Sequence, residues 1–158
     1  MSSVPELPAD LAALELVSPA TETEWASYFD LRWRLLRQPW NQTRGSEKDD
    51  SDAASYHLML RAPENGPALA VGRLHLNSPR EAQVRYMAVD PAWQGKGLGG
   101  RILAGLETRA RDLGCDEVVL NARESAIAFY IRHGYAMERE ADTLFGVVRH
   151  VRMRKGLL

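Results

Sequence analysis

Four glycines and a lysine are concentrated in residues 94–100, which read Gln-Gly-Lys-Gly-Leu-Gly-Gly. Leu98, Ile102, Leu106 and Leu113 recur at helical spacing, so the glycines lie where a helix begins. The first turn of a helix leaves backbone N–H groups unpaired at the positive end of its dipole, and glycine leaves those groups open to an anion. The stretch therefore predicts a site for a phosphate or pyrophosphate.

Two general phosphate-binding patterns fit this stretch poorly. A P-loop requires Ser or Thr after its Gly-Lys pair, whereas Gly97 follows Lys96. Gly95, Gly97 and Gly100 do match a dinucleotide fingerprint, but that motif belongs among alternating strands and helices, with an acidic residue about twenty positions on. Glu117 has that spacing only as the start of the next predicted strand. A nicotinamide-dependent enzyme is therefore the weaker alternative.

A third pattern carries a family resemblance. Gln94-x-x-Gly97-x-Gly99, directly after the strand-like residues 87–89 (Met-Ala-Val), resembles the acyl-CoA pyrophosphate loop of the GNAT superfamily of N-acetyltransferases. Residues 121–130 (Asn-Ala-Arg-Glu-Ser-Ala-Ile-Ala-Phe-Tyr), followed by a Gly-Tyr pair, resemble the later motif of that family. The resemblance spans residues 14–154 and is closest to the acetyltransferase half of bacterial two-domain proteins that also carry a thioesterase-like half, which is absent here.

The resemblance implies that acetyl-CoA donates an acetyl group to an amine. The pantetheine arm is expected to pair with backbone groups of Met87 and Val89, where the sheet splays beyond Val89, while Asn121 holds it from the other side. Tyr130 is expected to protonate the departing thiolate, the alternative being a tyrosine that only packs beside Phe129. The residues expected to bind acetyl-CoA are Met87, Ala88, Val89, Gln94, Gly95, Lys96, Gly97, Leu98, Gly99, Gly100, Asn121 and Ala126.

The base that accepts the amine proton does not follow from the resemblance. Several family members carry a glutamate where this chain has Gln83, and an amide cannot accept the proton. A hairpin that turns at Pro79 places His75 opposite Gln83, and an imidazole titrates near neutrality, so His75 is the candidate catalytic base. A structural role for His75 remains the alternative, as do Tyr56, Glu124 or a chain of waters as the proton acceptor.

The same hairpin places Arg73 opposite Arg85, and opposed like charges destabilise a sheet unless an anion lies beside them. Arg32 lies on the apolar face of the first predicted helix, where an unpaired charge is costly. One interpretation is that the three arginines bind a carboxylate or phosphate of the acceptor. The other is that acids of the protein neutralise them: Glu22, Glu24, Glu81 or another acid for the pair, and an acid such as Glu47 or Asp49 for Arg32.

The predicted elements place these residues on one α/β scaffold. Thr21 and Glu24 form a capping-box signature that starts a helix running to about residue 37, and residues 38–55 are expected to be loop or short helix. Further helices are predicted at 97–113 and 125–133, with strands at 14–17, 56–61, 68–76, 83–89, 117–120, 135–140 and 147–154. We therefore expect a flexible leader at residues 1–13, then a single domain over residues 14–158 with a twisted, mainly antiparallel sheet of six to seven strands flanked by helices.

Composition bounds the function further. The 158 residues are 45% hydrophobic and 26% charged, which suits one globular domain with a core. Lys and Arg number 20 and Asp and Glu 21, a net charge of -1, so we expect neither bulk attraction to nucleic acid nor to an anionic membrane. Cys115 is expected in the core, and the histidines lack metal-ligand spacing, so no metal is expected. No secretion signal or membrane-spanning run is recognisable, which predicts a cytoplasmic protein.

These patterns together predict an acetyl-CoA-dependent N-acetyltransferase. Its acceptor is expected to be a primary amine on a small molecule rather than on a protein, and to carry an anionic group. The competing class is a non-catalytic acyl-CoA-binding or interaction module, which would keep the glycine loop without needing Tyr130. The identity of the amine and the oligomeric state, a homodimer included, are left open.

Overall fold

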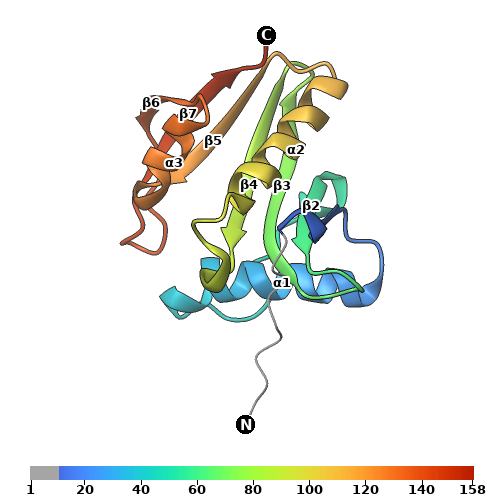
Figure 1. The fold of residues 1–158 in the computed structure, drawn as a ribbon. Helices are drawn as coiled ribbons and strands as arrows, with labels where there is room; N and C mark the ends of the chain where they lie inside the picture. Colours follow the sequence, from blue (N-terminus) through green and yellow to red (C-terminus); the bar gives the residue numbers. More distant parts are fainter. Residues whose placement is uncertain (1–10) are drawn as a thin grey trace.

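The computed structural model describes residues 11–158 and is built around a seven-stranded sheet with the strand order β1-β2-β3-β4-β5-β7-β6 (Figure 1). Neighbouring strands pair antiparallel except β4 and β5, which are parallel. The predicted single α/β domain with a mainly antiparallel sheet is thus confirmed. The strands are β1 (Glu15–Val17), β2 (Tyr56–Arg61), β3 (Ala68–Ser78), β4 (Glu81–Val89), β5 (Glu117–Arg123), β6 (Ala136–Glu140) and β7 (His150–Gly156).

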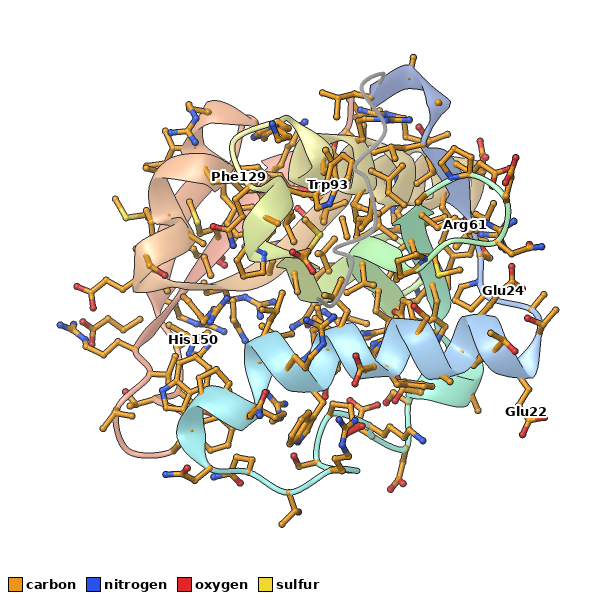
Figure 2. All side chains as sticks on the ribbon, turned by 60° about the horizontal axis from the view of Figure 1, so that its bottom comes forward. Glu22, Glu24, Arg61, Trp93, Phe129 and His150 are labelled. Atoms are coloured by element: carbon orange, nitrogen blue, oxygen red, sulfur yellow. The ribbon has the colours of Figure 1, made fainter. Side chains whose placement is uncertain are left out.

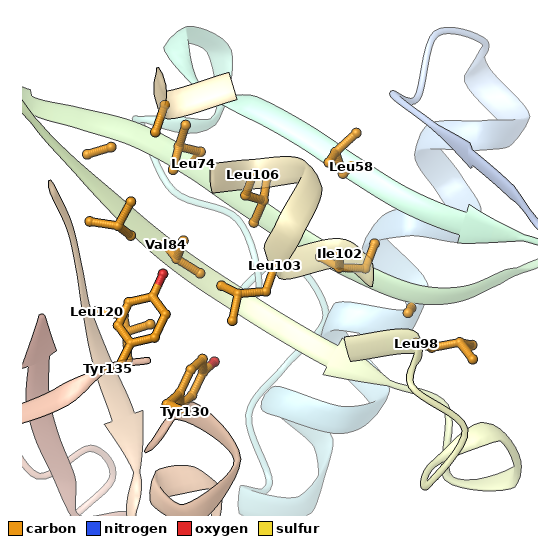
Figure 3. Close-up of a cluster of buried hydrophobic side chains, with 14 of the residues drawn as sticks. Leu58, Leu74, Val84, Leu98, Ile102, Leu103, Leu106, Leu120, Tyr130 and Tyr135 are labelled. Carbon is orange, nitrogen blue, oxygen red and sulfur yellow. The ribbon is translucent and has the colours of Figure 1, made fainter. Parts of the chain in front are cut away.

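Two helices cover opposite faces of the sheet. Side chains alternate along a strand, and in β3 Ala70 belongs to the core cluster that contains Ile102 of α2 (Leu98–Asp112), whereas Val71 belongs to the cluster that contains Leu31 of α1 (Glu22–Leu36). The short helix α3 (Ile127–Arg132) follows β5. Figure 3 shows the core on the α2 side, where Leu103 lies with Tyr130 and Tyr135.

The first helix begins where the sequence predicted. Thr21 Oγ1 accepts a hydrogen bond from the N–H of Glu24 (3.1 Å), and Glu24 Oε1 accepts one from the N–H of Thr21 (2.8 Å). This capping box satisfies two N–H groups that the helix itself cannot pair. Glu24 also contacts Arg61 of β2 (Figure 2), so the start of α1 is fixed to the sheet.

Strand β4 is bent at Tyr86, and this bend opens the sheet. Tyr86 has a left-handed φ of 55°, and the register with β3 shifts between Val71 and Arg73. Such a bulge increases the local twist of a strand. The parallel ladder with β5 ends at the pair Val84–Leu120, and Figure 1 shows the two strands diverging beyond it. The expected separation therefore begins after Val84, not beyond Val89.

The C-terminal strand differs from its prediction. It was expected over residues 147–154, but β7 begins at His150. The preceding residues form a tight turn in which Phe145 (φ 54°) and Gly146 (φ 71°) are left-handed and Leu144 pairs with Val148. The apolar β-branched pair before His150 explains why the sequence suggested an earlier start.

Three smaller expectations have mixed outcomes. Cys115 is 6% exposed and belongs to the core, as predicted. Most of the predicted leader lies outside the described residues, although Leu11–Ala13 form a short 3-10 helix. Within residues 11–158, no helix combines the length and apolar character that crossing a bilayer requires.

Candidate active site

The glycine loop opens α2 with unpaired backbone donors. Gly97 is the N-cap and has a left-handed φ of 82°, and the N–H of Arg101 is the first to bond back, to the Gly97 carbonyl (3.2 Å). The N–H groups of residues 98–100 donate to no residue that the structure describes. A Cβ on Gly99 would lie 3.1 Å from the ring of Phe129, so this glycine lets α3 approach the loop. The loop thus presents free donors at a positive helix end.

The free edge of β4 leads away from this loop. From Arg85 to Val89 the strand pairs with β3 on one side but has no ladder with β5 on the other. Gln94 of the loop reaches back, and its Nε2 donates to the Val89 carbonyl (3.1 Å). An extended ligand entering this gap would meet unpaired backbone groups, as an added strand does.

A cavity of ≈ 330 Å³ lies where β4 and β5 separate. Its lining includes five of the residues singled out from the sequence, namely Arg85, Met87, Asn121, Ala126 and Tyr130. His75, Arg32 and Arg73 do not line it, and neither do Ala88, Val89 or the loop residues 94–100. The structure therefore brings the predicted acid Tyr130 to the strand gap but separates it from the predicted base.

Tyr130 of α3 lines the cavity and is largely buried. Its side chain lies between Phe129 (ring centroids 5.0 Å apart) and Tyr135 (5.8 Å) and is 7% exposed. Burial raises the pKa of Tyr130 to about 12, although the charge of Arg123 opposes this rise. Because its pKa is raised, the Tyr130 hydroxyl is protonated near neutral pH. It forms no hydrogen bond with any described residue, so it is available to a ligand in the cavity.

His75 lies opposite Gln83 in the β3–β4 ladder, as predicted, but both of its ring nitrogens are engaged. Arg73 Nη2 donates to Nδ1 (3.3 Å), because a guanidinium has no acceptor, and Nε2 then donates to Asn77 Oδ1 (3.2 Å). Burial lowers the pKa of His75, and the charge of Arg73 lowers it further. His75 is thus neutral and held in the sheet, outside the cavity lining.

Arg32 and Arg73 are buried and paired within the protein. Arg32 is 0% exposed and donates to Asp52 Oδ1 (3.0 Å), the Glu47 carbonyl and the Tyr28 hydroxyl. Arg73 is 1% exposed and donates to Asp49 Oδ1 (2.6 Å) and to the same Asp52 oxygen (3.0 Å). Acids of the protein therefore neutralise these arginines, but the partners differ from those named in advance. Asp49 contacts Arg73 rather than Arg32, Asp52 contacts both, and Glu24 and Glu81 pair with other arginines.

Arg85 differs because it reaches the cavity. It lies directly opposite Arg73 in the β3–β4 ladder, as predicted. Its Nη1 lies 3.4 Å from Asp49 Oδ2, and 40% of its side chain is exposed. The ring of Tyr86 lies beneath both arginines, with centroid distances of 4.9 Å to Arg73 and 4.7 Å to Arg85. The like charges across the ladder are thus offset by the shared carboxylate of Asp49, by Asp52 beside Arg73, and by one aromatic face.

His150, unlike His75, lines the cavity. His150 begins β7, opposite Arg123 of β5, and Figure 2 shows it on the side of the C-terminal strands that faces the end of α1. Its Nδ1 lies 2.9 Å from the Val148 carbonyl, which only accepts, so the neutral ring carries its proton there. Nε2 is therefore the unprotonated nitrogen of the neutral ring. A hydrogen bond with the Asp142 backbone also acts on His150 and raises its pKa.

The comparisons with known proteins agree with this geometry. Residues 25–135 match the model of the acetyltransferase (GNAT) family. The chain belongs to this family. Among GNAT relatives, glucosamine 6-phosphate N-acetyltransferase of Trypanosoma brucei brucei is 36% identical over 138 residues, covering 82% of this chain and 81% of the relative.

Two bacterial relatives match at lower sequence identity. The uncharacterized N-acetyltransferase YjcF of Bacillus subtilis is 25% identical over 142 residues, covering 90% of this chain and 99% of its own. Aminoglycoside N(6')-acetyltransferase type 1 of Stenotrophomonas maltophilia is 24% identical over 134 residues, covering 78% of this chain and 85% of the relative.

Solved structures share the GNAT fold. An N-acetyltransferase structure from Lactobacillus plantarum superposes with a TM-score of 0.79 at 21% identity, covering 92% of this chain and 99% of that one. A GNAT family acetyltransferase from Elizabethkingia anophelis with acetyl-CoA bound superposes with a TM-score of 0.74 at 12% identity, covering 91% and 98%.

Sequence reasoning assigned no role to Arg37, Arg123 or His150 of this GNAT chain, although all three line the cavity. A signal existed for Arg123, which lies two residues after Asn121 in a strand and therefore on the same face. None existed for the other two, since Arg37 ends α1 and His150 follows the unforeseen turn.

Proposed function

We propose that this chain transfers the acetyl group of acetyl-CoA to the primary amine of a small molecule. The observation that carries the proposal is the position of Tyr130, whose protonated and otherwise unpartnered hydroxyl lies at the cavity where β4 and β5 separate. Family membership gives the reaction class, and this hydroxyl gives the cavity a group suited to one step of it.

The donor is proposed to bind along the strand gap. The free N–H groups of residues 98–100 suit its pyrophosphate, and the unpaired edge of β4 at Met87 and Val89 suits the amides of its pantetheine arm. Asn121 faces the same cavity from β5. For the Val89 carbonyl to accept a ligand amide, the Gln94 side chain that now donates to it must share or release it. The acetyl-CoA complex of the Elizabethkingia anophelis protein supports a donor of this kind.

The reaction is proposed to proceed by direct attack. The amine nitrogen bonds to the acetyl carbon, the carbon–sulfur bond breaks, and the sulfur keeps the electron pair. Tyr130 then gives its proton to that sulfur. Because burial raises the pKa of Tyr130 to about 12, the group holds its proton until negative charge develops beside it.

We assign acceptance of the amine proton to His150 in preference to His75. A base needs a neutral acceptor atom at the reacting centre. His150 offers Nε2 in the cavity, whereas both nitrogens of His75 are engaged outside it. Burial lowers the pKa of His150, and the charges of Arg123 and Arg85 reinforce this effect. Hydrogen bonds with the backbones of Val148 and Asp142 oppose it, but the pKa stays lowered, so the ring is neutral at physiological pH.

The acceptor is proposed to be a small molecule that carries an anionic group. The names of two relatives support a small acceptor, since one is named for aminoglycosides and the other for glucosamine 6-phosphate, an amine with a phosphate. The cytoplasmic location and the special likeness to the acetyltransferase half of two-domain proteins stay predictions.

Release of free CoA from acetyl-CoA, measured across a panel of amines, tests the proposal. The expected result is turnover with at least one small primary amine that is lost in Tyr130→Phe. Binding of acetyl-CoA without turnover of any amine, small molecule or peptide, would favour the alternative of a non-catalytic acyl-CoA-binding module.

A further inference from the structure

Two arginines line the cavity without a carboxylate partner. Arg37 is the C-cap of α1, and Arg123 is the last residue of β5. Among the described residues neither forms an ion pair with an acid, in contrast to Arg32, Arg73 and Arg85. A cation that is buried, as Arg37 is, or partly buried, as Arg123 is, normally has an acidic partner, so this pair requires explanation.

Arg37 is held rigidly. It is 9% exposed, its Nε donates to the Ser46 carbonyl (3.1 Å), and its Nη1 donates to the Leu36 carbonyl (2.8 Å). Its guanidinium lies 5.4 Å from the ring centroids of both Tyr86 and Phe145. These contacts fix its orientation but do not neutralise its charge.

Arg123 is joined to Arg37 through a pair of aromatic rings. Its guanidinium lies 5.6 Å from the ring centroid of Trp40, and Trp40 stacks on Phe145 at 6.1 Å. Phe145 reaches that position from the left-handed turn before β7, with a φ of 54° that is uncommon for an aromatic residue. Residues from α1, β5 and the β6–β7 connection thus hold both cations at one cavity wall.

The charges around the cavity leave this wall positive. Burial lowers the pKa of Arg37 and of Arg123. Tyr86 opposes this effect for Arg37 and Tyr130 opposes it for Arg123, whereas the charge of a neighbouring arginine reinforces it, Arg85 for Arg37 and Arg37 for Arg123. Tyr130 is neutral because its pKa is raised. Asp142 is the acid in the cavity lining, but it is exposed and forms no ion pair with a described residue. An anion bound here would therefore be strongly favoured.

We propose that Arg37 and Arg123 form a subsite for a carboxylate or phosphate of the acceptor, an inference that rests on the proposed transfer to a small amine. Two guanidiniums offer planar pairs of N–H donors that match either oxyanion. With the anion held at this wall, the acceptor amine reaches toward Tyr130 and His150 in the same cavity. The substrate class is then a bifunctional molecule with a primary amine and an oxyanion.

Matched acceptor pairs test the subsite and distinguish its ligand chemistry. The carboxylate arm compares β-alanine with β-alaninamide and 4-aminobutyrate with its amide, and the phosphate arm compares glucosamine 6-phosphate with glucosamine. Wild type should prefer the anionic member of at least one pair in kcat/KM. Arg123→Gln should reduce that preference by about tenfold to a hundredfold, the range expected for a lost hydrogen bond to a charged group.

Two further variants guard against misreading. Arg37→Lys keeps the positive charge, so the variant avoids leaving the site without its buried cation and is expected to fold. It loses the planar pair of N–H donors, so it should reduce the preference for the anionic acceptor only partly. Arg132→Gln removes an exposed arginine outside the cavity lining and should leave the preference at the wild-type ratio.

A binding measurement separates this inference from the proposed function. With CoA present, inorganic phosphate, 4-aminobutyrate and glucosamine 6-phosphate are titrated while the melting temperature is recorded. An anion-dependent rise in wild type that is lost in Arg123→Gln supports the subsite even if no amine is turned over. The subsite is refuted if the folded Arg123→Gln and Arg37→Lys proteins keep the wild-type substrate preference or the wild-type rise in melting temperature. It is also refuted if Arg123→Gln lowers the affinity for acetyl-CoA, because the two arginines would then bind the donor.

Discussion

Arg73 and Arg85 are opposed across the β3–β4 ladder, and one carboxylate, that of Asp49, contacts both. The Asp49 oxygens lie 2.6 Å from Arg73 Nη1 and 3.4 Å from Arg85 Nη1, and the Tyr86 hydroxyl donates to Asp49 (3.2 Å). Asp49 belongs to the connection between α1 and β2, so this contact ties that connection to the strand that carries the cavity. The arrangement makes the stability of the fold depend on the charge of Asp49.

Asp49→Asn is expected to lower the free energy of unfolding at pH 7 by roughly 1–3 kcal/mol, because the buried Arg73 would keep only Asp52 as an acidic partner. Asp50→Asn is the matched control, since Asp50 is exposed and forms no ion pair in the described chain. Urea denaturation of both variants measures the difference. Equal stability of the two variants would remove Asp49 from the account of how the arginines are neutralised.

The contribution of Asp49 to the free energy of unfolding should also depend on pH. Burial opposes its ionisation, but the hydrogen bond and charge of Arg73 prevail and lower the pKa of Asp49 from 3.8 to about 2. A group with a lowered folded pKa stabilises the protein above its unfolded pKa, and that stability is lost as the pH falls through the folded pKa. The difference between wild type and Asp49→Asn should therefore shrink between pH 4 and pH 2, as urea midpoints across that range would show.

Acetyl-CoA is expected to stabilise the protein through the glycine loop. A ligand that binds only the native state adds about 2.7 kcal/mol to its stability at a hundredfold excess over Kd, which appears as a rise in melting temperature. Gly97→Val should abolish that rise, because it places a branched side chain on the loop where the anion approaches. Gly45→Val is the matched control: both glycines have a left-handed φ and open space around the Cβ position, but Gly45 lies far from the loop in the sequence. A wild-type response in folded Gly97→Val would remove the loop from the donor site.

The hairpin shows how much of the site the sequence could predict. The turn at Pro79 and the alternation of β3 and β4 were sufficient to predict that Arg73 faces Arg85 and His75 faces Gln83. Local patterns also predicted the capping box, the start of α2 and the approach of Tyr130 to the strand gap through the family motif.

The acidic partners and the cavity wall could not be predicted in the same way. Asp52 reaches Arg32 and Arg73 from a connection without periodicity, so no spacing rule links them. Trp40 and Phe145 meet only because α1 ends beside a left-handed turn some hundred residues later. Such contacts depend on long-range packing, which alternation and helical spacing do not encode.

Tyr130→Phe is expected to lower kcat by about a hundredfold while acetyl-CoA affinity stays the same, because the ring still packs but no proton can be given to sulfur. Tyr135→Phe is the matched control. Its hydroxyl donates to Glu107 (2.8 Å) and does not line the cavity, so its loss should affect stability more than turnover. Steady-state kinetics and acetyl-CoA titration of both variants provide the measurement. Unchanged kcat in Tyr130→Phe, with chemistry shown to limit the rate, would assign Tyr130 to packing.

His75 and His150 give the sharpest test of which group accepts the amine proton. In wild type, kcat/KM should rise with pH through a group whose pKa lies below 6.5, because burial is the largest influence on the pKa of His150 and the charges of Arg123 and Arg85 lower it further. Hydrogen bonds with the backbones of Val148 and Asp142 act in the opposite direction without reversing the shift. The charged and titratable groups around this histidine are Arg123 on β5, Arg85 on β4, Arg37 at the end of α1, Tyr130 on α3 and Asp142 before β7.

His150→Gln should remove that rise and lower kcat/KM near neutral pH by roughly a hundredfold, since a glutamine amide cannot accept the amine proton. In this variant the remaining pH dependence should follow the ionisation of the amine alone, so activity should recover partly at high pH. His75→Gln should keep the wild-type profile, because the ring nitrogens of His75 are occupied by Arg73 and Asn77 outside the cavity. The pH dependence of kcat/KM for both variants decides between them: loss of the rise in His75→Gln and its retention in His150→Gln would return the role of base to His75.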